Sequence, residues 1–185
     1  MTATLEREIK LRFDDAESAR DAILRAGATP VRGRRLQEDC LLDTADDELR
    51  ERRCVLRVRV ESGKSLLTFK GPVQPSLLKI REELETVVGD GDLVVRMLEQ
   101  LGFRVWFRYQ KYREEFALDD VLLALDETPV GTFVEIEGGD RGIAETAEAL
   151  GRGPSDYLVD SYRRLYLSHC ETVGIAVTDM LFEDE

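Results

Sequence analysis

Pairs of like-charged residues, separated by one position, recur along this chain. The pairs are Glu6/Glu8, Arg57/Arg59, Glu83/Glu85, Lys111/Arg113 and Glu135/Glu137. Where such a pair lies on a β-strand, both side chains point to the same face. Like charges in that arrangement repel each other, so stability alone would not favour them. The pairs therefore indicate a face that binds a charged ligand.

The cationic residues of this pattern are suited to phosphate. They are Lys10, Arg57, Arg59, Lys70, Lys111 and Arg113, with Arg81 as a further candidate. A guanidinium offers paired donors that match two phosphate oxygens, and an ammonium adds a compact positive charge. No series of aromatic residues that could stack bases accompanies the set. It therefore indicates a site for linked phosphates and not a nucleic-acid groove.

The acidic residues are suited to a hard divalent cation. They are Glu6, Glu8, Asp126, Glu135 and Glu137, together with Glu85 or Glu83. Of the last two we expect Glu85 to face the metal, and Glu83 to be a salt-bridge partner or to support the ligands. Mg²⁺ is commonly held by one or two carboxylates and by the phosphates of a substrate. The two sets together predict that the cations bind phosphate while the carboxylates position a metal ion and water.

Eight segments have the alternating pattern of β-strands, and four have the pattern of helices. The strands are expected at residues 5–13, 36–43, 54–61, 65–71, 79–85, 107–116, 121–127 and 132–138, and the helices at 15–27, 92–102, 142–151 and 155–170. Helices that cover the apolar strand faces leave the charged faces on the other side. Closure of the sheet turns those faces inward. The sequence predicts an α+β fold, an eight-stranded antiparallel closed barrel with helices packed outside.

The composition narrows the class of protein. The chain has 185 residues and no Pro- or Ser-rich linker, which favours one domain. A net charge of -12 argues against a protein that binds nucleic acid or an anionic membrane through its general field. The three cysteines form no CxxC pair, so we expect neither a disulfide framework nor a zinc knuckle. With no signal sequence or membrane-spanning run, we expect a cytoplasmic protein.

The order of the charged motifs resembles that of the CYTH superfamily, the triphosphate tunnel metalloenzymes. Glu6-Arg7-Glu8-Ile9-Lys10 matches the ExExK motif that opens the family. Further along, the chain has counterparts of the R-x-R, Lys-Gly-Pro, R-x-E-x-E and K-x-R elements, at residues 56–59, 69–72, 81–85 and 111–113, and of the acidic stretches, at 125–127 and 130–137. The resemblance covers about residues 5–167. It departs in the second strand, where Leu41 stands at a position that is often aromatic in the family.

This resemblance implies an eight-stranded tunnel that binds a triphosphate-containing small molecule with Mg²⁺ or Mn²⁺, and a possible homodimer. We assign residues 1–170 to the tunnel domain, and residues 171–185 to a C-terminal tail of unknown role. Lys10 and Glu8 are the expected catalytic residues, because Lys10 would neutralise charge at the phosphoryl group that is cleaved. Tyr162 resembles the family's C-terminal Ser-Tyr element and is expected to pack against the barrel, with a substrate contact as the alternative.

Three functions remain open on the sequence. The leading hypothesis is a metal-dependent hydrolase of inorganic triphosphate or thiamine triphosphate. The first alternative is a class IV adenylate cyclase, in which the ribose 3'-hydroxyl of ATP, and not water, attacks the α-phosphorus. The second alternative is a binding module for polyphosphate that catalyses no reaction. The intact set of acidic residues argues against it.

Overall fold

The computed structural model describes residues 4–183 of the chain. Its strands are β1 (Thr4–Phe13), β2 (Thr29–Thr44), β3 (Val55–Glu61), β4 (Lys64–Lys70), β5 (Lys79–Val88), β6 (Phe103–Leu118), β7 (Val121–Thr128) and β8 (Gly131–Glu137). Its helices are α1 (Ala16–Arg25), α2 (Glu48–Glu51), α3 (Gly91–Gln100), α4 (Asp140–Ala149) and α5 (Tyr162–Val173), with a 3₁₀ turn at Pro154–Asp156. No helix in the described part of the chain is long and apolar enough to cross a membrane.

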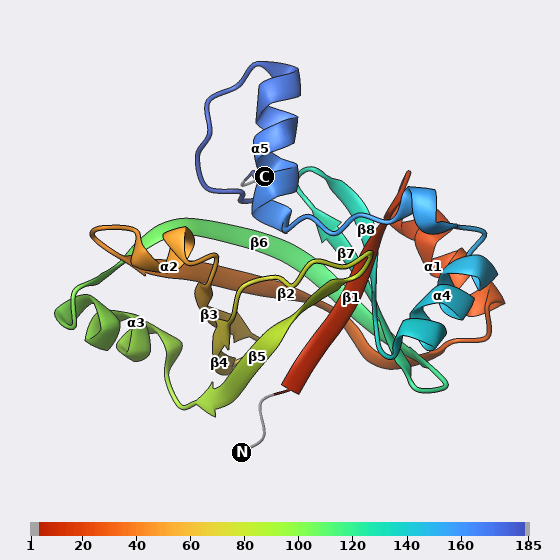
Figure 1. Cartoon of the computed structure of the whole chain (residues 1–185), viewed down its shortest axis with the longest axis horizontal. Helices are drawn as coiled ribbons and strands as arrows, with labels where there is room; N and C mark the ends of the chain where they lie inside the picture. The colour runs from red at the N-terminus through yellow and green to blue at the C-terminus, as the bar shows by residue number, and fades with distance from the viewer. Residues whose placement is uncertain (1–3, 184–185) are drawn as a thin grey trace.

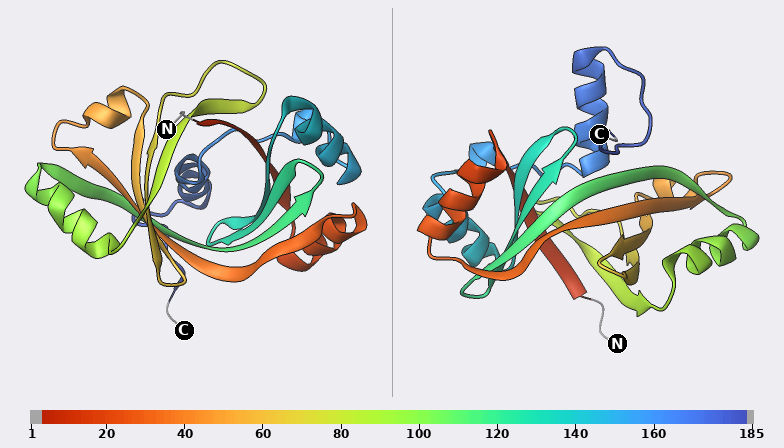
Figure 2. Two further views of the ribbon diagram at one scale, coloured as in Figure 1. Left: turned by 90° about the horizontal axis from the view of Figure 1, so that it is seen from below. Right: turned by 180° about the vertical axis from the view of Figure 1, so that it is seen from behind.

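The eight strands form one closed antiparallel barrel in the order β1-β5-β4-β3-β2-β6-β7-β8. Seen from below, the strands surround an opening, and α5 lies across its far side (Figure 2). Closure removes both sheet edges and gives every strand an inner and an outer face. The predicted fold class is confirmed: an α+β protein with helices outside a closed barrel.

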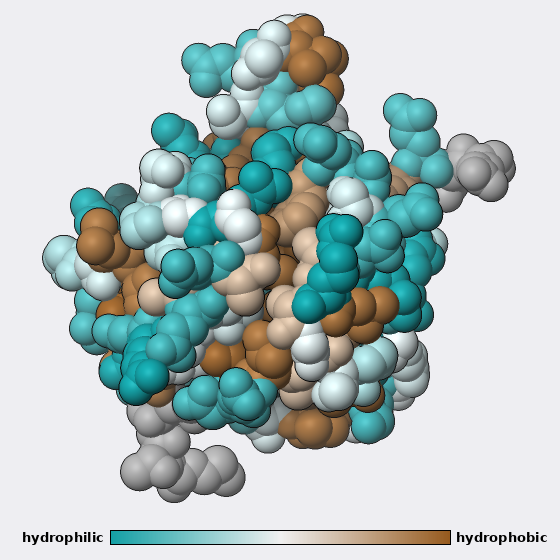
Figure 3. Space-filling model, turned by 90° about the vertical axis from the view of Figure 1, so that its right-hand side faces the viewer, coloured by the Kyte–Doolittle hydropathy of each residue, from teal (hydrophilic) through white to brown (hydrophobic). Residues whose placement is uncertain are grey.

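The main apolar core lies between the outside of the barrel and two helices. Ile9 and Leu11 on β1 are fully buried there, and they pack with Ile23 of α1 and Ile143 of α4. Figure 1 shows α1 and α4 side by side against the barrel. The outer surface on that side is largely hydrophilic, with scattered hydrophobic residues (Figure 3). Because the alternating apolar residues of β1 face this core, Glu6, Glu8 and Lys10 must face the barrel interior.

A second apolar cluster fixes α5 and the end of the chain to the barrel. It contains Phe107 and Tyr109 of β6, Tyr162 and Tyr166 of α5, and Met180. The backbone N–H of Gln110 donates to the Met180 carbonyl at 2.9 Å, and the N–H of Met180 donates to the Arg108 carbonyl at 3.0 Å. The segment after α5 therefore returns to β6, beside the end of the tunnel that α5 covers.

The helix expected at residues 155–170 is wrong over its first seven residues, 155–161. Ser155 lies in the 3₁₀ turn, and α5 begins at Tyr162 with Ser161 as its N-cap. The reason is a long-range pairing, because Leu158 exchanges two backbone hydrogen bonds with Lys10, at 2.8 and 2.9 Å. An extended residue at position 158 cannot belong to a helix. As a result, Tyr162 comes to lie directly over the tunnel interior.

We predict that Ile9→Ala lowers the free energy of unfolding by about 2–5 kcal/mol, because it leaves a cavity under α1 and α4. Denaturant unfolding measures the change. Leu101→Ala is the control, since Leu101 is 74% exposed and its loss should cost less than about 0.5 kcal/mol. Equal losses in the free energy of unfolding for the two variants would contradict this description of the core.

Candidate active site

The charged faces predicted from the sequence line the interior of the barrel. A cavity of about 440 Å³ runs through it. The expected site residues on its wall are Glu6, Glu8, Lys10, Arg57, Arg59, Lys70, Glu85, Lys111, Arg113, Glu135 and Glu137. Asp126 is fully buried and accepts hydrogen bonds from Lys111 and Arg113. The structure therefore brings together every residue that the charge pattern singled out.

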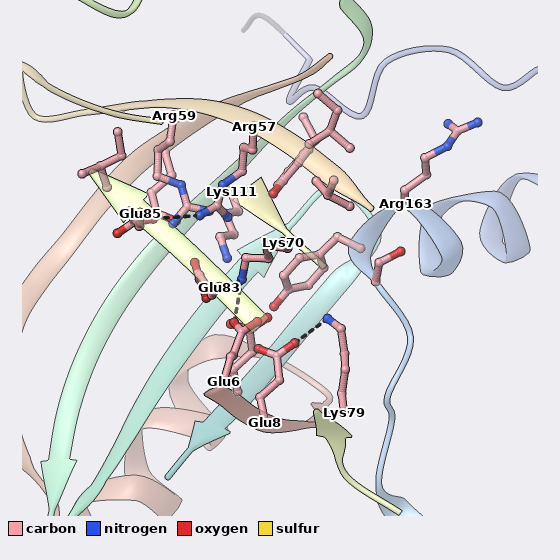
Figure 4. A pocket seen from close by; sticks show the side chains of 18 of the residues that line it. Glu6, Glu8, Arg57, Arg59, Lys70, Lys79, Glu83, Glu85, Lys111 and Arg163 are labelled. Atoms are coloured by element: carbon pink, nitrogen blue, oxygen red, sulfur yellow. Dashed lines mark hydrogen bonds and ion pairs between the residues drawn. The ribbon is translucent and has the colours of Figure 1, made fainter. Parts of the chain in front are cut away.

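The carboxylates of β1 pair with ammonium groups of β1 itself and of other strands of the barrel. Glu6 accepts a hydrogen bond from Lys70 Nζ at 2.6 Å, and Glu8 accepts one from Lys10 Nζ at 3.0 Å. Lys10 also pairs with Glu135 at 3.1 Å. Burial favours the neutral form of Glu8, but the positive charges of Lys10 and Lys79 outweigh it and hold the pKa of Glu8 well below its usual range. The two carboxylates of the ExExK motif are therefore ionised in the free protein. Figure 4 shows Glu6 beside Lys70 and Glu8 beside Lys79.

Lys79 is a tunnel residue that the sequence reasoning missed. Its Nζ donates to Glu8 at 2.5 Å, and the residue is 6% exposed. Burial, and then the charge of Lys10, lower the pKa of Lys79 to about 8. The signal was present, because Lys79 stands two residues before Arg81 and so shares its face of β5.

A buried carboxylate on β2 orients the Arg57/Arg59 pair. Asp39 accepts hydrogen bonds from Arg59 Nε at 2.9 Å and Nη2 at 3.2 Å, and its other neighbour is Arg57 Nε at 3.4 Å. Arg57 also donates to Thr68 and Glu85. The sequence reasoning missed Asp39 because it has no like-charged neighbour two positions away. The regular spacing of Gln37, Asp39 and Leu41 on one face was the available signal.

Asp126 on β7 connects the cations of β6 to α5. Its carboxylate accepts hydrogen bonds from Lys111 Nζ at 2.8 Å, from Arg113 Nε at 2.7 Å and from the Tyr162 hydroxyl at 2.5 Å. Arg113 also pairs with Glu135. Burial and the charge of Arg113 lower the pKa of Lys111 to about 8. Asp126 is thus the anchor of a buried network, and its assignment as a metal ligand stays a prediction.

Tyr162 closes the tunnel on the side of α5. Its ring lies under two ammonium groups, with Lys10 Nζ 5.2 Å and Lys111 Nζ 4.7 Å from the ring centre. The face of a tyrosine ring attracts cations. The expected packing of Tyr162 against the barrel therefore also places its ring beside two phosphate-binding candidates.

Comparison with known proteins places this arrangement in a family. The model of the CYTH domain matches residues 4–156. The chain belongs to the CYTH family. CYTH proteins are metal-dependent enzymes that bind triphosphate substrates.

Individual proteins are similar to this chain over most of their length. A protein of Methanocaldococcus jannaschii named "Putative adenylate cyclase" is 29% identical over 147 residues, which are 79% of this chain and 83% of the relative. The PH1012 protein of Pyrococcus horikoshii has a TM-score of 0.74 at 27% identity, covering 86% of this chain and 98% of its own. HpAC1 from Hippeastrum has a TM-score of 0.70 at 20% identity, covering 93% of this chain and 97% of its own.

The donor chemistry of the CYTH tunnel fits a divalent cation. Partial burial and the negative charges of Glu6, Glu8 and Glu83 raise the pKa of Glu137 to about 7, and burial raises the pKa of Glu83. A cation among these carboxylates would relieve their repulsion. Within residues 4–183, however, no three acidic, cysteine or histidine side chains are already arranged around a common point. Glu83 lies with this group, whereas Glu85 pairs with Arg57 at 3.3 Å.

We predict that Asp126→Asn destabilises the CYTH barrel by about 3–5 kcal/mol in denaturant unfolding, because it leaves buried cations without their partner. Tyr162→Phe should cost less, about 1.5–3 kcal/mol, because it removes one hydrogen bond to a charged group. The control is Asp119→Asn, which changes an exposed carboxylate in the turn after β6. A cost for Asp126→Asn no larger than that of the control would contradict the role of Asp126 as an anchor.

The raised pKa of Glu137 predicts that metal binding by this carboxylate depends on pH. In the metal-free protein Glu137 takes up a proton on folding, so its contribution to stability is lost as the pH rises from 4.5 to about 7. We therefore predict that Mg²⁺ raises the Tm more at about pH 8 than at about pH 6, because only the ionised carboxylate attracts the cation. Glu137→Gln should remove this difference, and Glu145→Gln on α4 should keep it. An equal rise at both pH values in the unchanged protein would show that Glu137 takes no part.

Proposed function

We propose that this chain is a metal-dependent hydrolase of triphosphate compounds. The observation that carries the proposal is the division of one enclosed cavity between a row of cations and a group of carboxylates. Arg57, Arg59, Lys70, Lys111 and Arg113 line this cavity together with Glu6, Glu8 and Glu137. This is the arrangement that a polyphosphate chain and its metal ion require together.

The cations would bind the phosphate chain by exchanging partners. In the free protein Lys70 is held by Glu6 at 2.6 Å and by Glu83 at 3.0 Å, and Lys111 is held by Asp126. A triphosphate brings oxygens that compete for these donors and a negative charge that favours the protonated form of Lys79 and Lys111. Arg57 and Arg59 keep their orientation through Asp39, so two guanidinium groups are ready for phosphate oxygens.

The carboxylates would hold the metal ion, Mg²⁺ or Mn²⁺. Glu6, Glu8, Glu135 and Glu137 are the proposed ligands, with Glu83 or Glu85 as a further one. When bound, such an ion polarises a phosphoryl oxygen and lowers the pKa of water. Lys10 lies between Glu8 and Glu135, where its ammonium would neutralise charge on the phosphoryl group that is cleaved. Glu8 positions Lys10 and Lys79 through direct contacts.

The names of the relatives bring two reactions into consideration. HpAC1 is described as an adenylyl cyclase candidate that reveals a dominant triphosphatase activity. The archaeal relative carries an adenylate cyclase name. Both reactions use the same phosphate cradle, and they differ in the nucleophile. We favour hydrolysis because most of the residues that line the cavity are charged, which suits a bare phosphate chain.

Product analysis tests the proposal. Purified protein with Mg²⁺ or Mn²⁺ is offered inorganic triphosphate, thiamine triphosphate and ATP in parallel. The proposal expects metal-dependent release of orthophosphate, and inorganic triphosphate is the first substrate to examine. Cyclic AMP and pyrophosphate from ATP would establish the cyclase reaction in its place. Binding of triphosphate without any product would favour a binding module.

We predict that Glu8→Gln lowers kcat by at least about 100-fold, because the neutral amide can neither attract the metal ion nor hold Lys10 and Lys79. The affinity for inorganic triphosphate, measured by isothermal titration calorimetry without metal, should change much less than kcat. Glu145→Gln on the outer helix α4 is the matched control and should keep full activity. Unchanged turnover in Glu8→Gln would contradict the proposed metal site.

A further inference from the structure

A second, smaller cavity lies beside the end of β1. Its volume is about 190 Å³, and its wall is formed by Arg12, Arg152, Ser155, Asp156 and Leu158. We call this space the outer cavity, because none of these residues lines the tunnel. The chain between α4 and α5 crosses β1 at this point (Figure 1). The crossing brings together two arginines that are 140 positions apart in the chain.

The end of α4 holds Arg152 in position. Gly151 has the left-handed backbone conformation that ends many helices, with a φ of 72°. The backbone N–H of Arg152 then donates to the Ala147 carbonyl in the last turn, at 2.9 Å. The guanidinium carbon lies 5.0 Å from the centre of the Phe13 ring. The Arg152 side chain is therefore oriented by the fold before any ligand arrives.

The Arg152 guanidinium lacks the acceptors that a buried donor needs. Its Nε is buried and has no hydrogen-bond partner among the described residues. Its Nη2 donates to the backbone carbonyl of Arg12 at 3.5 Å, and no carboxylate of residues 4–183 pairs with it within 4 Å. The nearby end of α4 favours a positive charge, but it does not account for a buried donor without an acceptor, which costs free energy. An oxygen atom in the outer cavity would supply that acceptor.

Arg12 brings a second guanidinium with unused donors. Its guanidinium carbon lies 4.7 Å from the centre of the Phe133 ring, and its Nη1 donates to the Val130 carbonyl at 3.5 Å. Contact with the face of an aromatic ring steadies a guanidinium and leaves the donors in its plane for other partners. In the described part of the chain Arg12 too has no carboxylate within 4 Å. The chain has 38 acidic and 26 basic residues, so stability alone would not leave two neighbouring arginines without an acidic partner.

The acidic residue of the cavity wall is already engaged. A carboxylate oxygen of Asp156 accepts a hydrogen bond from the backbone N–H of Gly153 at 2.9 Å, which closes the 3₁₀ turn. Neither guanidinium of the outer cavity lies within 4 Å of this carboxylate. Ser155 adds a hydroxyl group to the wall. The wall therefore offers an excess of donors and of positive charge, which suits an anion.

The outer cavity touches the segment that connects the tunnel with α5. Arg12 stands two residues after Lys10 on β1, and Leu158 exchanges two backbone hydrogen bonds with Lys10. Three residues after Leu158 comes Ser161, the N-cap of α5, and then Tyr162 at the tunnel. A ligand in the outer cavity would therefore change the surroundings of the Leu158 amide, which provides a local signal of its binding.

We propose that the outer cavity binds a small tetrahedral oxyanion of the phosphate class. Paired donors of a guanidinium match two oxygens of such an ion, and two arginines supply two such pairs. The volume of the outer cavity is less than half that of the tunnel cavity, which suits a single phosphate group. The proposal does not depend on the reaction in the tunnel, because the two cavities share no lining residue.

An NMR titration of the full chain tests this site without any turnover. The Nε–Hε signal of Arg152 and the backbone amide signals of Ser155 and Leu158 are followed in ¹H–¹⁵N correlation spectra as inorganic phosphate is added at constant ionic strength. The expected result is a saturable shift of all three signals with one Kd, below about 10 mM. Signals that stay in place, or that move equally when chloride replaces phosphate, would overturn the proposal.

Matched variants test the part played by each arginine. Arg152→Gln and Arg12→Gln should each weaken the phosphate affinity reported by Leu158 at least about tenfold, because each removes hydrogen bonds between charged groups. Arg25→Gln removes an exposed arginine of α1 and should leave this affinity unchanged. An undiminished affinity in Arg152→Gln would contradict the site.

Phosphate that enters the tunnel is followed separately, through the amide signals of Arg59 and Lys70. These signals should respond equally in the unchanged protein and in Arg152→Gln. If the Leu158 signal followed the same titration curve as the tunnel signals in both proteins, Leu158 would be reporting the tunnel, and the outer site would be overturned. A parallel titration with glycerol phosphate identifies the source of the oxyanion: tighter binding of orthophosphate supports a free ion in the outer cavity, and tighter binding of the ester supports the phosphate group of a larger molecule.

Discussion

The rest of this structure depends on the pairing of charges inside a closed barrel. Taking a carboxylate or an ammonium out of water costs several kcal/mol per ion unless a partner of opposite sign is close. The charges of the tunnel therefore lie where another strand of the barrel supplies the opposite sign, as Glu6 of β1 does for Lys70 of β4 and Asp39 of β2 does for Arg59 of β3. The register of the barrel is fixed by this matching on its inner face and by apolar packing on its outer face.

The same pairing keeps the cavity ready for a ligand. An apolar interior of this width would collapse or fill with side chains, whereas ion pairs hold long side chains along the walls. The carboxylates that are not fully balanced, Glu83 and Glu137, have raised pKa values. The acidic residues thus repel one another, and a divalent cation would relieve that repulsion. The cationic residues would be stabilised in the same way by a polyanion. Stability and ligand binding place opposite demands on the same residues.

The like-charged pairs predicted the barrel and most of its inner wall because a two-residue period is visible in the sequence. Asp39 escaped notice because it is a single charge, whereas Lys79 forms a pair with Arg81 that the sequence reasoning overlooked. Only the three-dimensional register shows that Asp39 faces Arg59 and that Lys79 faces Glu8. The start of α5 could not be predicted, since the pairing of Leu158 with Lys10 joins segments almost 150 residues apart. Trp106 reaches the cavity through a bulge, and a bulge leaves no mark in a hydropathy pattern.

The measurement that tests the central claim most directly is ³¹P NMR of a reaction run in ¹⁸O-enriched water, with Mg²⁺ and inorganic triphosphate and then with ATP. Hydrolysis in the tunnel predicts metal-dependent formation of orthophosphate, with a water-derived ¹⁸O in the products that shifts the resonance of the labelled phosphorus. Cyclic AMP and pyrophosphate free of label would contradict this account, since the nucleophile would then be a ribose hydroxyl. Unchanged spectra with both substrates would contradict it as well.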